Sequence, residues 1–151
     1  LTIVHGQVDH QDEHCLRAPT QDGEEDADRA AIESCTRFIQ AQLELALGEH
    51  DELDLSEDEE VVVDLAFQGP ESVDVQRFAF RLGRALHALQ DSFTHTFRSA
   101  DGRSIRHVLN FSEWAGDRGY DAMRDGFHHL SALDQCRNHD PLVQRNVRLA
   151  E

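Results

Sequence analysis

The clearest hydrophobic pattern lies near the middle of the chain, where apolar residues recur at intervals of three and four. On a helix of 3.6 residues per turn, this spacing collects the apolar side chains into one stripe. We therefore predict a long helix over residues 73–98. Its apolar stripe comprises Phe78, Leu82, Ala85, Leu86, Leu89, Phe93 and Phe97.

A second stretch with the same spacing covers residues 30–47. Its apolar positions are Ile32, Cys35, Ile39, Leu43 and Leu47, and Gly48 stands where such a helix would end. Segments 104–115 and 119–136 are interpreted as further helices. The residues from Pro141 onward are interpreted as a last short helix or a tail.

The remaining segments carry weaker patterns. The stretch VVVDLAF, residues 61–67, is short and β-branched, which fits either a strand or a buried helical turn. Residues 49–60 are typical of an acidic, solvated connector. Residues 1–28 are typical of a loop-rich region that leads into a helix. The fold class predicted from these patterns is mostly α: an irregular helical bundle with long loops, forming a single helical domain over residues 1–151.

The charge is strongly acidic, with 30 Asp and Glu against 14 basic residues and a formal net charge of −16. Repulsion between this charge and phosphate groups opposes non-specific nucleic-acid binding and docking on anionic membranes. No apolar run approaches the ~20 residues of a membrane-spanning helix, so no transmembrane segment is expected. The composition leaves the oligomeric state open.

The three cysteines are Cys15, Cys35 and Cys136. Three cysteines can form one disulfide and leave one free thiol, or all three can remain as buried thiols. No leader peptide is visible, but the chain starts at Leu1 rather than Met, so an upstream region could have been removed. We expect a secreted or periplasmic protein.

The candidate chemistry lies in the stretch HALQDSFTH, residues 87–95. It places His87, Asp91 and His95 at four-residue intervals, on the side of the predicted helix opposite the apolar stripe. Imidazole and carboxylate groups one turn apart on a helix can converge on a zinc ion. The same three residues also fit the solvated face of an ordinary helix, so the spacing alone leaves both interpretations open.

The longer segment LGRALHALQDSFTHTF, over about sixteen residues, resembles the zinc-dependent phospholipase C and S1/P1 nuclease superfamily. It is most similar to the branch with HET-C-type proteins, whose helix reads ALHxLQDxxxH. The resemblance implies that His87 and Asp91 bind zinc, that Asp91 bridges two ions, and that His95 completes another zinc site. It therefore implies zinc as cofactor, with more than one ion as an option.

The resemblance also points to ligands outside this helix. DHQDEHC offers His10 and Asp12 for an earlier His-x-Asp of that branch, with His5 and His14 as reserve ligands. In SIRHVLNFSEW, His107 matches a later histidine. Phe111 stands one helical turn after it, where the family has an acidic residue, and Glu113 comes two positions later. The ligand set implied by the resemblance is His87, Asp91, His95, His10, Asp12 and His107.

The function implied by the resemblance is metal-assisted hydrolysis of a phosphoester, phospholipase C-like or nuclease-like, with a phospholipid, a nucleic acid or a small phosphodiester as substrate. The alternative is a non-catalytic helical interaction domain with a partial or degenerate metal site. The acidic position taken by Phe111, and Leu1 in place of the N-terminal tryptophan ligand of the phospholipases, favour this alternative. HQDEH also matches the His-x-x-Glu-His pattern of inverted zinc proteases, but it lacks the apolar flanks of a buried helix.

Overall fold

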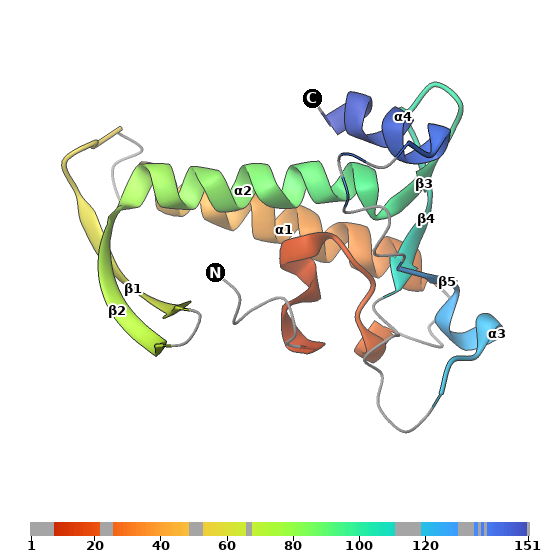
Figure 1. The fold of residues 1–151 in the computed structure, drawn as a ribbon, viewed down its shortest axis with the longest axis horizontal. Helices are drawn as coiled ribbons and strands as arrows, with labels where there is room; N and C mark the ends of the chain where they lie inside the picture. Colours follow the sequence, from red (N-terminus) through yellow and green to blue (C-terminus); the bar gives the residue numbers. More distant parts are fainter. Residues whose placement is uncertain are drawn as a thin grey trace.

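Two long helices form the centre of the fold. The computed structural model describes residues 8–21, 26–48, 53–65, 68–110, 119–129, 135, 137 and 139–150. Helix α1 (Ala27–Leu47) and helix α2 (Arg77–Thr94) lie side by side along most of their length (Figure 1). The helix predicted over residues 30–47 is confirmed as α1, which begins three residues earlier and ends at Gly48 in the left-handed region, with φ 79°.

Small residues mediate the contact between the two helices. The buried apolar positions are Ala27, Ala31, Cys35 and Ala46 on α1, and Ala85 and Ala88 on α2. Short side chains let the two backbones approach closely, whereas the bulky Leu86 and Leu89 remain exposed. The predicted apolar stripe of α2 is therefore wrong at these two leucines, because the spacing of apolar residues does not show which of them meets the neighbouring helix.

The long central helix is shorter than predicted because both of its ends continue into strands. Strand β1 (Asp58–Leu65) pairs antiparallel with strand β2 (Gly69–Gln76), with Val61 opposite Val73. The β-branched stretch at residues 61–65 is thus a strand. Residues 73–76 belong to its partner strand, and α2 starts only at Arg77.

A second sheet follows α2, in the order β3 (Thr96–Arg98), β4 (Ile105–Asn110) and β5 (Phe127–His128). Strand β4 runs antiparallel to β3 and parallel to β5. The helices predicted over 104–115 and 119–136 are wrong where the structure describes these segments. Residues 105–110 form β4, and the only helical turn is α3 (Ala122–Asp125).

The predicted fold class is therefore wrong. The described residues contain four α-helices and two small sheets, a mixed α/β architecture rather than a mostly α, irregular helical bundle or an all-helical domain. The physical reason lies in pairing between distant segments. Backbone hydrogen bonds to β3 and β5 fix Ile105–Asn110 as a strand, and such tertiary pairing overrides weak local preference.

The N-terminal segment packs against both long helices. It forms two short 3₁₀ helices, η1 (Val8–His14) and η2 (Pro19–Gln21), and η1 contacts α1 and α2. A disulfide joins Cys15, directly after η1, to Cys35 in the middle of α1. The buried disulfide packs against Ala88 of α2, so three segments meet at this point.

The C-terminal helix α4 (Pro141–Ala150), which the sequence left as a helix or a tail, packs against α2 near the second sheet (Figure 1). Leu16, Leu109 and Val143 form a small core there, with Phe97 and Val147 packed on it. None of the described helices is long and apolar enough to cross a membrane.

Candidate metal centre

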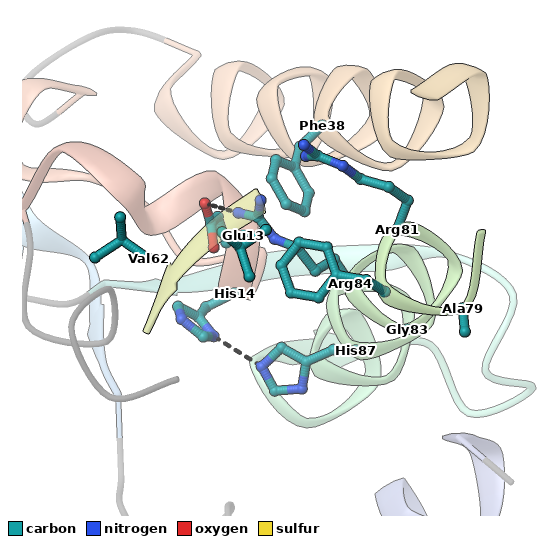
Figure 2. A pocket seen from close by; sticks show the side chains of 11 residues that line it. Glu13, His14, Phe38, Val62, Ala79, Arg81, Gly83, Arg84 and His87 are labelled. Carbon is teal, nitrogen blue, oxygen red and sulfur yellow. Dashed lines mark hydrogen bonds and ion pairs between the residues drawn. The ribbon is translucent and has the colours of Figure 1, made fainter. Parts of the chain in front are cut away.

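Three side chains from two segments converge beside α2. His14 ends η1, while His87 and Asp91 lie one turn apart on α2. His14 Nδ1 lies 2.9 Å from Asp91 Oδ2, and His87 Nε2 lies 3.2 Å from the same oxygen. The two imidazole nitrogens are 3.3 Å apart, and Figure 2 shows the dashed line that joins them. The three atoms therefore form a nearly equilateral triangle.

Two connections hold η1 in this position. The disulfide ties Cys15, the neighbour of His14, to α1. The carboxylate of Glu13, on the other side of His14, forms an ion pair with Arg84, one turn before His87 on α2 (Figure 2). His14 is buried, whereas the side chain of His87 is 48% exposed, so the triangle has a closed side and an open side.

The donor atoms fit a metal ion. Ligand atoms ~2.1 Å from a tetrahedral zinc ion lie about 3.4 Å apart, close to the three sides of the triangle. Without an ion, His14 Nδ1 forms a hydrogen bond with Asp91 Oδ2, and His87 Nε2 lies within ion-pair distance of the same oxygen. Because all three atoms already lie within 4.8 Å of one another, this group can hold a metal ion with little rearrangement.

His95 has a different position from the one predicted. It caps the end of α2, where its backbone N–H donates to the Asp91 carbonyl oxygen. Its ring Nδ1 lies 2.6 Å from the His14 carbonyl oxygen, and the ring packs edge-on against His129. In the part of the chain that the structure describes, His95 stands outside the three-ligand group and contacts the backbone of one ligand.

The structure does not bring the other three predicted ligands, His10, Asp12 and His107, to the group. The exposed His10 faces Glu13, with 3.6 Å between its Nδ1 and the carboxylate. Asp12 accepts a hydrogen bond from the Glu13 N–H, and burial, assisted by the negative charge of Glu13, raises the pKa of its carboxyl group. His107 Nδ1 lies 3.2 Å from the Asp28 carboxylate. The segments with His5 and with Phe111 and Glu113 lie outside the described residues.

Of the predicted ligands, the structure therefore joins His87 and Asp91, and it adds His14, which the sequence offered only as a reserve. Histidine spacing gave no reason to prefer His14 over His10. The pairing of Cys15 with Cys35 is the feature that could have selected it, because this bond ties residue 14 to the pair of long helices.

A pocket of about 640 Å³ adjoins the triangle. His14 and His87 belong to its wall, so a molecule in the pocket reaches two of the three candidate ligands. The remaining lining residues come from η1, α1, β1 and α2: Glu13, Phe38, Val61, Val62, Ala79, Phe80, Arg81, Gly83 and Arg84.

Comparisons of the chain with protein-family models, curated proteins and solved structures give no match.

Proposed function

We propose that the protein is a zinc-dependent phosphoester hydrolase whose ion is held by His14, His87 and Asp91. The observation that carries the proposal is the triangle of donor atoms with sides of 2.9, 3.2 and 3.3 Å. Two imidazoles and a carboxylate are typical of catalytic zinc sites, which keep a fourth position for water or substrate. Bound zinc supplies a more acidic water and stabilises negative charge on a phosphoryl group.

The residues of the chain contribute binding and access. His14 is held by the disulfide and by the Glu13–Arg84 ion pair, so the buried side of the site is fixed before a substrate arrives. The half-exposed His87 lies where the pocket meets the triangle, which leaves the site open to a substrate. Because the described residues gather three ligands, we propose one ion.

The Cys15–Cys35 disulfide supports the proposed secreted or periplasmic location. Disulfides form and persist in oxidising compartments and are rare where thiols are kept reduced.

Turnover of bis-p-nitrophenyl phosphate by the zinc-loaded protein tests the activity. We expect hydrolysis that His87→Ala abolishes and that a chelator removes. His107→Ala is the matched control, since the exposed fractions of the two side chains are 48% and 51%, and His107 pairs with Asp28 instead. Turnover that survives His87→Ala, or a protein that binds no zinc, would contradict the proposal.

A second candidate function is a non-catalytic interaction domain that binds zinc for structure. The observation in its favour is the set of exposed leucines on the two central helices, Leu43, Leu45, Leu47, Leu86 and Leu89. Exposed apolar patches often mark interaction surfaces. Zinc binding without any phosphodiester turnover would favour this second function.

A further inference from the structure

The pocket beside the metal centre has mainly apolar walls. The apolar lining residues include Phe38 of α1, Phe80 of α2, and Val61 and Val62 of β1. The volume of about 640 Å³ lies in the range of pockets for small molecules. The lining residues of α2 run from Ala79 to His87, so the pocket follows the helix for about 12 Å at 1.5 Å per residue.

The two arginines of the pocket are already neutralised. Arg84 pairs with Glu13, and Arg81 Nε lies 2.8 Å from a carboxylate oxygen of Glu59. Because each arginine is paired with a glutamate, the two ion pairs together give the pocket wall no net charge.

Both guanidinium groups also lie over aromatic rings. The central carbon of Arg84 is 5.2 Å from the centre of the Phe38 ring, and that of Arg81 is 5.5 Å from the Phe80 ring. At these distances the cations are attracted to the ring faces, which holds them along the wall. Because the arginine charges are neutralised and two half-buried aromatic rings line the wall, the pocket favours an apolar group over an anionic one.

We propose that this pocket is the subsite for an unbranched alkyl chain of the substrate. The long, apolar shape suits an extended chain, and the two histidines at its wall place the attached phosphoester at the metal centre. The inference rests on the proposed function for the position of the ester. Its own content is the preference for an alkyl substituent, determined by Phe38, Phe80, Val61 and Val62.

The test compares methyl, butyl and octyl esters of p-nitrophenyl phosphate, each below its micellar concentration, with the zinc-loaded protein. Burial of one methylene is worth about 0.8 kcal/mol, or about fourfold, so burial of the three added methylenes should raise kcat/KM roughly 60-fold from methyl to butyl, with a further rise to octyl. A flat series would overturn the proposal.

Val62→Asn is the variant that identifies the wall, because Val62 is 63% exposed and its replacement should not prevent folding. Loss of its apolar contact should lower the octyl-to-methyl ratio by roughly threefold to tenfold. Leu55→Asn is the matched control: Leu55 is 62% exposed but does not line the pocket, so the ratio should stay unchanged. Equal ratios in the two variants would overturn the assignment of this wall.

Calorimetric binding of octylphosphonate and methylphosphonate to the zinc-free protein separates this inference from the proposed function. Tighter binding of the octyl compound, weakened by Val62→Asn, supports the subsite even if no turnover is found. Turnover without chain-length dependence in either assay contradicts the subsite alone.

Discussion

Removal of the Cys15–Cys35 disulfide should weaken both the fold and the metal centre. The bond closes a loop with a sequence separation of 20 residues. In the chain-entropy model, such a loop stabilises the folded state by about 3 kcal/mol at 25 °C. The double variant Cys15→Ala/Cys35→Ala removes the bond without placing a hydroxyl group in this buried position. Cys15 has a positive φ of 48°. Alanine adopts this φ no more easily than cysteine, so the backbone strain at position 15 is the same in the wild type and in the variant.

Urea denaturation of the metal-free protein measures the expected loss of about 3 kcal/mol. Cys136→Ala is the control, since it removes a thiol and leaves this disulfide in place. Thiol titration of the denatured wild-type chain should find one free thiol of the three cysteines.

The double variant should also bind zinc about 10- to 100-fold more weakly, the range found when groups that orient a ligand are removed. His14 is the residue next to Cys15 and would lose its covalent tether to α1. Three free thiols in the wild type, or a double variant with unchanged stability and zinc affinity, would refute the reasoning.

Three further outcomes follow from the described contacts. His87→Ala should lower zinc affinity by about 100-fold, because one ligand of four supplies about 3 of the ~12 kcal/mol typical of zinc binding. The stability of the metal-free protein should change little. His107→Ala should change neither the zinc affinity nor the stability, both measured by calorimetry. Ala88→Leu should cost about 1–3 kcal/mol in thermal denaturation, because Ala88 is fully buried between the helices, whereas Ala41→Leu on the exposed face of α1 should cost little. Asp101 accepts hydrogen bonds from the Ser99 hydroxyl and the Arg103 N–H, which lower the pKa of its carboxyl group. The stabilisation by Asp101 is therefore present above its ordinary pKa of about 3.9 and disappears as the pH falls through the lower folded value. The difference in Tm between wild type and Asp101→Asn should shrink from pH 7 to pH 3, and a constant difference would contradict this.

The sequence predicts the elements that depend on local pattern. The spacing of apolar residues over 30–47 and the following Gly48 are confirmed as α1 and its end. The same reasoning overextends α2, because Val73 and Val75 fit a helical pattern as well as the strand that they form opposite β1. The choice between the two depends on a partner strand more than ten residues away, which a local window does not contain.

In the candidate site, too, the local pattern predicts some features, and others depend on contacts between distant segments. His87 and Asp91 are one turn apart on one helix, so their proximity follows from the sequence. His14 comes from a segment 73 residues from His87, and its place depends on the packing of η1 and on a disulfide whose pairing the sequence left open. His95 has the right spacing, but α2 ends before it, and its ring faces the His14 carbonyl oxygen.

The most direct test of the central claim is a calorimetric titration of zinc into the metal-free protein and its His14→Ala variant, with His10→Ala as the control from the same segment. We predict one zinc ion per chain in the wild type and in His10→Ala, and loss of tight binding in His14→Ala. Absence of zinc binding to the wild type, or equal affinity with and without the His14 imidazole, would contradict the assignment of His14, His87 and Asp91 as the metal ligands.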